Sequence, residues 1–503
     1  MRTLYRATRV HTLFHPAQGE WLLADGRHVQ RVGSGDPPAA DRVVDLPGAT
    51  IVPGFIDSHV HLTGTGIHEA GPDLTAVRSA PELVRVLTEA GEEGESTLLT
   101  HGWDETKWDR PELPSLEELD RVTQRPLVAV RTDGHICLAN TRALSDSGAL
   151  DYDGVERGED GGPTGVLRRQ ANVEVQRWFH ESLADHDIEG FQLHAAGIAA
   201  SRGITCVHEM AIPALRGMRD VEVLLRQRER LPVDVVPYVA TTDIPLVMDL
   251  GLARIGGDLS LDGSIGARTA HLSAPYDDGE GSGVAYLEND DLSEFLHNAH
   301  LAGLQVGLHV IGDAAIEQAV ACWERVYGSL DSRERRHFRA RRHRLEHFEM
   351  PSDDVVERTA MLGLAVSVQP AFDAAWGHPG ELYEQRVGEK RAATMNPFRT
   401  YLSRGIEIGG GSDAPITALD AWAGIRALEQ HHDDAQRFTR DEAVRVFTWG
   451  SARLAHLDDK KGRLVPGAQA DFAAYDDDPM VVDSSDELRP VLTVSLGREV
   501  FAS

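Results

Sequence analysis

Two histidines, His59 and His61, close an apolar run in the segment PGFIDSHVHL, residues 53–62. Residues i and i+2 of a strand project from the same face, so both imidazoles can bind one metal ion. The chain holds 23 histidines, and an isolated pair of this spacing is more often two surface side chains at a strand end. The interpretation as a chelate therefore depends on what the rest of the chain supplies.

Three further residues with metal-binding side chains lie close to other apolar runs. His309 lies in QVGLHV, His347 in RLEHF and Asp413 in GGGSDAP. Each is near the carboxyl end of a candidate strand, where the active sites of parallel barrels are built. Imidazole nitrogens and a carboxylate suit a divalent ion such as Zn²⁺, which can lower the pKa of a water in an open position. An aspartate beside that water can take its proton, so the pattern predicts a catalytic metal centre.

The elements that must position these residues alternate between strand and helix. Eight short apolar or β-branched runs are candidate strands, at residues 50–55, 204–207, 233–239, 259–265, 305–310, 344–348, 364–368 and 406–409. Helix-like stretches separate most of them, and residues 291–303 begin at an N-cap aspartate and stop at a glycine. Eight such units in about 400 residues favour an α/β fold of the (β/α)₈ TIM barrel type, although a doubly wound sheet gives the same local pattern.

Two regions fall outside this alternation. Residues 1–50 and 462–503 consist of short strand-like runs broken by turns, and we expect them to pair into one small β-domain. The barrel is then expected to occupy residues 51–461. Within it, the stretch at about residues 67–190 is too long for one crossover and has strand and helix signals of its own. We predict that it is an insertion after the first strand, covering the mouth of the barrel.

Composition restricts the class of function. The chain has 50 Lys and Arg against 80 Asp and Glu, a formal charge of −30, which disfavours nucleic acid and anionic membranes as partners. No apolar run approaches the roughly 20 residues of a membrane span, and the first residues lack the apolar segment of a signal peptide. The three cysteines show no paired spacing. We expect a soluble cytoplasmic protein that acts on a small molecule, and a homo-oligomer is compatible with the sequence.

The same segments resemble a known family. PGFIDSHVHL, the strand-end histidines and SDAP are similar to the amidohydrolase superfamily, and GWDETKWDRPELPSLEELD, RPLVAVRTDGHICLANTRAL, LDGSIGARTA, HVIGDAA and KGRLVPGAQADFAAYD resemble its family 3, which includes N-substituted formamide deformylases. The resemblance implies a (β/α)₈ barrel, a β-sandwich-like domain made from both chain ends, and hydrolysis of amide, N-acyl or N-formyl C–N bonds. It also implies that His59, His61 and Asp413 bind one metal, with Asp413 as general base. His309 and His347 would bind a second metal.

One departure from that family concerns the residue that bridges two metals. Many members carry a carboxylated lysine four residues before the aspartate of a DG motif, where this chain has Asp258 before Asp262, and none of its four lysines lies in a candidate barrel strand. An aspartate is about 4 Å shorter than a carboxylated lysine, so we expect Asp258 to fall short of both ions. Glu209, at the end of ITCVHE, is a second candidate bridge or a solvated strand-end residue. We favour one tightly bound ion, held by the paired histidines and Asp413.

Four residues are predicted to contact the substrate. By the resemblance, His135 in RTDGHICLAN faces the substrate from the insertion, with a purely structural role as the alternative, and Asp262 of the DG motif is a further candidate for substrate binding. Trp103 in GWDETKWD can wall a pocket or pack within the insertion. Arg268 in GARTA can bind a substrate carboxylate or phosphate, or form a salt bridge within this acidic protein.

Two alternatives stand beside hydrolysis of a C–N bond. Deaminases of the superfamily commonly carry a glutamate a few residues after the fifth-strand histidine, whereas here none follows His309 until Glu317. A non-catalytic ligand-binding protein on the same fold is disfavoured by the complete set of five potential metal ligands. Hydrolysis at a centre of one or two divalent ions therefore remains the leading hypothesis.

Overall fold

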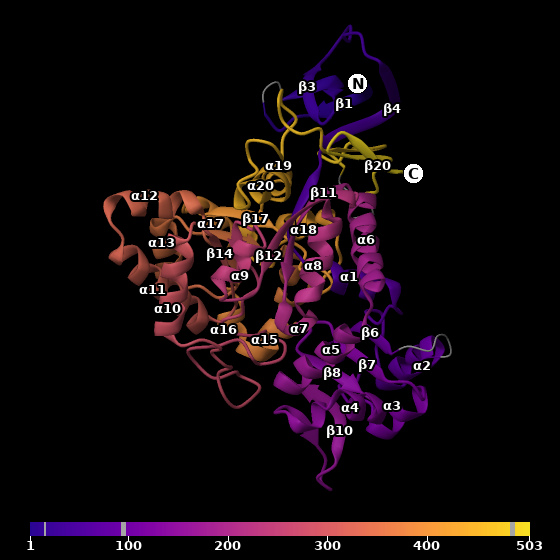
Figure 1. The fold of residues 1–503 in the computed structure, drawn as a ribbon, viewed down its shortest axis with the longest axis vertical. Helices are drawn as coiled ribbons and strands as arrows, with labels where there is room; N and C mark the ends of the chain where they lie inside the picture. Colours follow the sequence, from indigo (N-terminus) through magenta and orange to yellow (C-terminus); the bar gives the residue numbers. More distant parts are fainter. Residues whose placement is uncertain (15–16, 92–96, 483–487) are drawn as a thin grey trace.

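The computed structural model describes residues 1–14, 17–91, 97–482 and 488–503 (Figure 1). Residues 15–16 and 483–487 of the expected terminal domain, and 92–96 of the expected insertion, lie outside the described residues. The described strands form four sheets. Two of these sheets carry the potential metal ligands, and the other two lie at opposite ends of the molecule in Figure 1.

Two parallel sheets contain the strands that the alternating pattern predicts. Their orders are β12-β11-β5 and β13-β14-β15-β16-β17. The bounds are β5 Phe55–Val60, β11 Ile204–Ala211, β12 Asp234–Val239, β13 Arg254–Ile255, β14 Gln305–Val310, β15 Arg344–His347, β16 Ala365–Val368 and β17 Glu407–Gly410. All residues of β5, β11, β14, β15 and β16 are buried, as in parallel sheets covered by helices. A parallel bridge between Val60 and Ala414 links the end of β5 to the segment after β17.

The fourth strand begins earlier and is shorter than the sequence predicts. The expected strand at 259–265 is absent, and within it Ser260 forms an isolated bridge to His309. Gly256 and Gly257 follow β13 with φ of +79° and +73°, a backbone conformation that favours glycine. A Cβ at Gly256 would lie 2.1 Å from the carbonyl oxygen of Gly307. The chain therefore leaves strand geometry at this close-packed glycine pair, immediately before Asp258.

Helices alternate with the parallel strands and pack around them (Figure 1). They include α6 Asp185–Ser201, α8 Met218–Gln227, α9 Ile244–Asp249, α10 Asn289–Leu301, α11 Asp313–Ser329, α13 Asp353–Leu362, α17 Phe398–Ser403 and α18 Ala421–Glu429. The helix expected at 291–303 is α10, which begins two residues earlier, so that Asp291 lies in the first turn, where the backbone N–H groups favour its charge. Among the described residues, no helix combines the length and apolar character needed to cross a bilayer.

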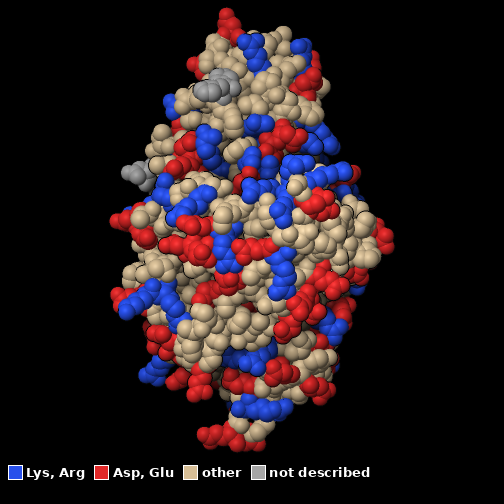
Figure 2. All heavy atoms as spheres, turned by 90° about the vertical axis from the view of Figure 1, so that its left-hand side faces the viewer, with Lys and Arg blue, Asp and Glu red and all other residues tan. Residues whose placement is uncertain are grey.

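Strands from both ends of the chain share one mixed sheet, of order β20-β19-β18-β4-β1-β2-β3. Their bounds are β1 Arg2–His11, β2 Gln18–Asp25, β3 His28–Gly33, β4 Arg42–Pro53, β18 Phe472–Tyr475, β19 Leu492–Ser495 and β20 Arg498–Ala502. Strand β4 continues through Gly54 into β5, and a Cβ at Gly54 would lie 2.3 Å from the hydroxyl oxygen of Thr205. On the face drawn in Figure 2, acidic and basic side chains lie interspersed.

The segment between the first two parallel strands contains a sheet of its own, of order β6-β7-β8-β10-β9. Its elements are α1 Leu62–Ala70, α2 Ala80–Gly91, β6 Leu98–Trp103, α3 Leu116–Val122, β7 Leu127–Arg131, β8 Ile136–Ala139, α4 Thr141–Ser147, β9 Val155–Arg157, β10 Pro163–Arg168 and α5 Arg169–Ser182. Asn140 caps α4, and its Oδ1 accepts from the N–H groups of Leu127 and Ala143, each at 3.0 Å. A separate hydrophobic core that includes Trp103 supports this sheet.

Candidate metal centre

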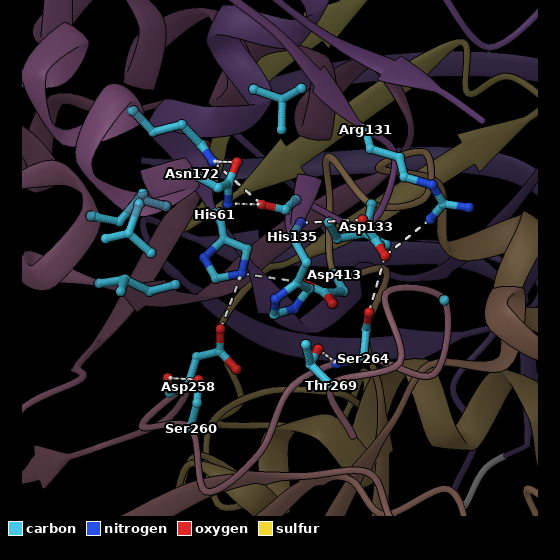
Figure 3. Close-up of a pocket in the computed structure, with 18 of the residues that line it drawn as sticks. His61, Arg131, Asp133, His135, Asn172, Asp258, Ser260, Ser264, Thr269 and Asp413 are labelled. Carbon is cyan, nitrogen blue, oxygen red and sulfur yellow. Dashed lines mark hydrogen bonds and ion pairs between the residues drawn. The ribbon is translucent and has the colours of Figure 1, made fainter. Parts of the chain in front are cut away.

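The carboxyl ends of the parallel strands bring six potential metal ligands together. They are His59 and His61 at the end of β5, Asp258 after β13, His309 in β14, His347 in β15 and Asp413 after β17. One ligand atom from each of His59, His61 and Asp413 lies within 4.8 Å of the other two, and the same holds for His59, Asp258 and His347. Figure 3 shows His61, Asp258 and Asp413 facing one another in the cavity. The two groups share His59.

Hydrogen bonds behind the paired histidines leave one nitrogen of each imidazole for a cation. His59 Nδ1 is 3.0 Å from Oε2 of Glu346, and His61 Nδ1 is 2.7 Å from the carbonyl oxygen of Met210. Both Nε2 atoms face Oδ1 of Asp413, at 3.4 and 3.1 Å. Histidine ligands commonly engage their second nitrogen with a carboxylate or carbonyl in this way, which fixes the ring orientation.

Several buried ligand atoms in this cluster have no hydrogen-bond partner. They include Nε2 of His59, both ring nitrogens of His347 and Oδ1 of Asp413. Buried polar atoms are normally satisfied, so such a concentration in one place needs an explanation. A donor set of imidazole nitrogens and carboxylate oxygens fits a divalent ion such as Zn²⁺.

The two carboxylates of the cluster are held in the ionised form. Burial alone would raise the pKa of Asp413, but the charge of His59 and the adjacent imidazole of His61 hold the pKa below its ordinary value. Asp258 is buried as well, and His309 beside it keeps its pKa well below the usual range. Both side chains are therefore available as anionic ligands or proton acceptors near neutral pH.

Asp258 reaches both sets of histidines, contrary to the expectation based on side-chain length. Its Oδ1 lies 2.9 Å from Nδ1 of His309 and 3.6 Å from Nε2 of His347. Its Oδ2 lies 3.6 Å from Nε2 of His61. The expectation assumed a regular fourth strand, whereas the glycine pair after β13 redirects the backbone and compensates for the short side chain. The geometric objection to a shared carboxylate at this position is therefore removed.

Glu209 is buried and turned toward the backbone. Its Oε2 accepts a hydrogen bond of 2.6 Å from the N–H of Leu62, and burial raises its pKa to about 7. Among the described residues it belongs to neither ligand group of the centre. The structure therefore shows neither the expected bridge nor the solvated alternative, because Glu209 anchors the backbone directly after His61.

A cavity of about 620 Å³ lies over the cluster, and five of the six potential ligands line it. The insertion supplies another part of its wall, including His135, which Figure 3 shows near Asp413. Burial lowers the pKa of His135, so its imidazole is neutral. Apolar side chains such as Leu99, Ile212 and Trp376 line much of the remainder. A concave, largely apolar site with a few polar groups suits a small organic molecule.

Two of the residues predicted to contact the substrate, Trp103 and Arg268, bind other parts of the chain instead. Trp103 is fully buried in the core of the insertion, and its Nε1 donates to the carbonyl oxygen of Ala129 at 2.8 Å. Arg268 donates to both carboxylate oxygens of Asp278, at 2.9 and 2.7 Å. Neither side chain lines the cavity. In both cases the packing or ion-pair alternative describes the observed contact.

Asp262 also lies outside the cavity lining, in a fully buried position. Its carboxylate accepts from the N–H groups of Ile311 and Gly312, at 3.1 and 2.8 Å, and from that of His271 at 2.9 Å. These bonds hold the segment that follows His309. In the structure, Asp262 therefore fixes backbone behind the site rather than lining the cavity.

Sequence reasoning missed a layer of charged residues behind the ligands. Asp57 accepts from the N–H groups of His59 and Ser412, at 3.1 and 3.0 Å, and so ties β5 to the segment before Asp413. Arg344 donates to Oε2 of Glu346 at 2.8 Å. The available signal was the presence of charged residues within otherwise apolar strands, which need buried partners.

Comparison with known proteins places the chain in a family. The model of the amidohydrolase family matches residues 42–501. The chain belongs to the amidohydrolase family. This family member is 27% identical over 477 residues to the putative amidohydrolase YtcJ of Bacillus subtilis (strain 168), covering 88% of the chain and 86% of the relative. It is 22% identical over 505 residues to the N-substituted formamide deformylase of Arthrobacter pascens, covering 90% and 88%.

A solved structure extends the similarity to the fold. The crystal structure of an uncharacterized metal-dependent hydrolase from Pyrococcus horikoshii OT3 matches with a TM-score of 0.76 and 26% identity, covering 96% of this chain and 99% of that one. The match supports a TIM-barrel-like α/β fold for this amidohydrolase-family chain. Family membership and the grouped histidines and aspartates together support a hydrolytic reaction that depends on a divalent metal.

Proposed function

We propose that this chain is a metal-dependent hydrolase that cleaves an amide, N-acyl or N-formyl C–N bond of a small molecule. The observation that carries the proposal is the meeting of two potential ligand groups, with an ionised Asp413, beside a cavity of about 620 Å³. The relative from Arthrobacter pascens is named as a deformylase of N-substituted formamides, which favours this bond class. The proposed fold is a closed (β/α)₈ barrel at residues 51–461, with an insertion at 67–190 and a β-sandwich-like domain from 1–50 and 462–503.

The side chains of the centre have distinct roles in this reaction. His59, His61 and Asp413, with Asp258, His309 and His347 beside them, would hold a divalent ion such as Zn²⁺, which polarises a carbonyl and lowers the pKa of water when bound. Asp413 accepts a proton from the attacking water and delivers it to the leaving amine. Glu346 and the carbonyl of Met210 keep the imidazoles of the paired histidines oriented.

The described part of the centre gives no support to the deaminase alternative. The first acidic residue after His309 is Asp313, and its Oδ1 accepts from the N–H of Ser273 at 2.9 Å. Among the cavity-lining residues the other carboxyl groups come from elsewhere in the chain, such as Asp133 and Glu349. A non-catalytic binding protein would retain the cavity but would need no proton acceptor at the metal ligands.

Asp413→Asn tests the assignment of the general base. The amide still offers an oxygen to a metal but accepts no proton, so kcat should fall on the order of 10²- to 10⁴-fold. Turnover is measured on N-formyl, N-acetyl and N-acyl amines and amino acids, with metal content determined by elemental analysis of the same samples. Near-normal turnover by metal-loaded Asp413→Asn would remove Asp413 from this role. Failure of the metal-loaded wild type on the whole panel would contradict the proposed reaction.

A further inference from the structure

Arg216 is a buried arginine in the wall of the cavity. It ends α7 (Pro213–Arg216), which follows β11 directly, and it is 9% exposed. Its Nε and Nη1 atoms have no hydrogen-bond partner, and among the described residues no carboxylate pairs with it. The chain has 80 acidic residues for its 50 Lys and Arg, so a surplus of potential partners exists. An arginine left unpaired under these conditions needs an explanation, since burying an unpaired charge is costly.

The other arginines at the cavity are paired within the chain. Arg131 binds Asp104, Glu105 and Asp133, at 2.9, 2.7 and 2.9 Å. Nη1 of Arg169 lies 3.3 Å from Oδ2 of Asp153, and both residues line the cavity. Only Arg216, among the described arginines that line the cavity, lacks an acid of its own.

The charge of Arg216 acts against the rise in pKa that burial causes at two acids, Asp220 and Glu209, and both are engaged with other groups. Asp220 accepts from the hydroxyl of Thr63 at 2.5 Å and from the amide of Gln192 at 3.2 Å. Burial raises the pKa of Asp220 above its ordinary value. Glu209 accepts a hydrogen bond of 2.6 Å from the backbone N–H of Leu62, directly after His61. These carboxyl groups therefore do not neutralise the guanidinium by direct contact.

The guanidinium of Arg216 lies beside the segments that carry two potential metal ligands. A Cβ on Gly64 would lie 2.4 Å from its Nη2 atom and 3.5 Å from Cδ of Pro415. Gly64 is three residues after His61, and Pro415 is two residues after Asp413. The missing side chain at Gly64 thus provides the room that the guanidinium occupies, close to the metal centre.

Two buried imidazoles near Arg216 are neutral. His101 and His180 both line the cavity. Burial lowers the pKa of His101 to about 3 and that of His180 well below its ordinary value, and the charge of Arg216 contributes to both shifts. Nδ1 of His101 is buried without a hydrogen-bond partner. This corner of the cavity therefore combines one cation with uncharged imidazoles that can form hydrogen bonds.

We propose that Arg216 binds the carboxylate of the substrate, so that the substrates are N-acyl or N-formyl amino acids rather than neutral amides. The inference rests on the proposed function, and it specifies the substrate class of the same site. A guanidinium pairs with a carboxylate through two parallel hydrogen bonds, which fix orientation as well as affinity. With the carboxylate at Arg216, the amide of a small amino-acid derivative faces the neighbouring metal ligands, and the apolar lining receives the side chain.

A matched pair of substrates tests this inference. N-formyl-L-phenylalanine and N-formylphenethylamine differ by the α-carboxylate alone, and the readout is the ratio of their kcat/KM values. The wild type should prefer the carboxylated substrate by at least about 10-fold, as expected for a charge-assisted bidentate contact. Arg216→Met should lower the ratio by about the same factor, mainly through the KM of the carboxylated substrate, and Arg216→Lys should lower it less. Arg268→Met, which removes an arginine outside the cavity, should leave the ratio unchanged.

The variant Gly64→Ala tests the same inference without replacing the arginine. The added methyl group should displace the guanidinium of Arg216 and so lower the ratio of the two kcat/KM values. An unchanged ratio in metal-loaded, folded Arg216→Met would overturn the inference while leaving the hydrolase proposal in place. If the wild type hydrolyses neither these two substrates nor any compound of the panel, the hydrolase proposal fails, and calorimetry with 3-phenylpropionate still tests the anion site. The metal-loaded wild type should bind this probe about 10-fold more tightly than Arg216→Met, and equal affinities would contradict the inference.

Discussion

The two sides of the cavity come from different parts of the fold, one from the ends of the parallel strands and the other from the insertion. On one side, histidines and aspartates lie at or just after the ends of parallel strands. Buried residues behind them hold some of these side chains by hydrogen bonds, as Glu346 holds Nδ1 of His59. On the other side, the insertion contributes His135 from the connection between β7 and β8, and Asn172 from α5. Asn172 donates to the carbonyl oxygen of Gly134 at 3.0 Å, within the insertion itself. The first side is fixed by the core of the sheets, whereas the second rests on a separate core.

This difference suggests that the strand side carries the metal and proton chemistry and that the insertion side determines the choice of substrate. Ligands that are oriented by buried bonds hold their geometry through a reaction, which is what metal and proton chemistry requires. A wall carried by an inserted unit can change its side chains without disturbing that geometry, and so can set the choice of substrate. Substitutions of the ligands at the strand ends, or of the residues that orient them, should therefore alter metal content and kcat, and substitutions on the insertion side should alter KM.

The largest effect is expected from replacing both His59 and His61 with alanine. His59 belongs to both ligand groups, so its loss together with His61 should remove bound metal and reduce activity to background. Elemental analysis and turnover measure the two effects, and circular dichroism serves as the control for folding. A folded double variant that retains the metal content of the wild type would refute the assignment of the paired histidines.

A smaller effect on the same side is expected for Glu346→Gln. The amide keeps the size of the side chain but removes the charge that faces Nδ1 of His59 and pairs with Arg344. Metal affinity should fall by roughly 10- to 100-fold, the usual range for residues that orient a ligand. A competitive chelator titration measures the affinity, and added metal should restore part of the activity. An unchanged affinity would mean that the orientation of His59 does not depend on Glu346.

On the insertion side, His135→Ala should act on substrate binding. Its neutral imidazole can donate or accept one hydrogen bond, so its loss should raise KM by about 3- to 10-fold, with little change in kcat or metal content. Steady-state kinetics on the best substrate of the panel gives both parameters. A dominant loss of kcat instead would place His135 with the chemical side of the cavity and would blur the distinction between the two sides.

The smallest effect is expected for Arg268→Met, outside both sides of the cavity. Asp278 keeps a second partner in Arg386, and the lost pair is partly exposed, so the free energy of unfolding should change by less than about 1 kcal/mol. Kinetic constants should stay at their wild-type values. Chemical denaturation and steady-state kinetics check both statements, and a clear rise in KM would restore Arg268 as a substrate contact.

Much of the strand side could be predicted from sequence because periodicity and strand ends are local properties. The apolar runs at 305–310 and 344–348 end close to His309 and His347, and parallel strands align their carboxyl ends at one edge. The fourth strand could not be placed in this way. Its course depends on the close approach of Gly256 to the backbone of β14, which is a tertiary contact without a periodic signal.

The roles of the arginines near the cavity were less predictable, because they depend on which partners surround each side chain. Arg268 and Arg216 are equivalent as residue types, yet Arg268 is paired with Asp278, whereas Arg216 is buried and no acid of the described ranges pairs with it. Sequence reasoning selected the first from its position in a family motif and did not single out the second. Which arginine is left unpaired follows from the positions of acids that lie far away in the chain, and no local pattern encodes those positions.

Strand β4 acquires its two neighbours at very different times during synthesis. It pairs with β1, made just before it, and with β18, which emerges after most of the chain. Until then the edge at residues 50–53, which is buried in the finished protein, has no strand beside it and is open to pairing with other nascent chains. Strand β4 runs through Gly54 into β5. The strand that still lacks β18 as its neighbour is therefore continuous with the strand that carries His59. Premature termination before β18 would therefore leave an unpaired strand edge directly joined to the strand end that carries His59.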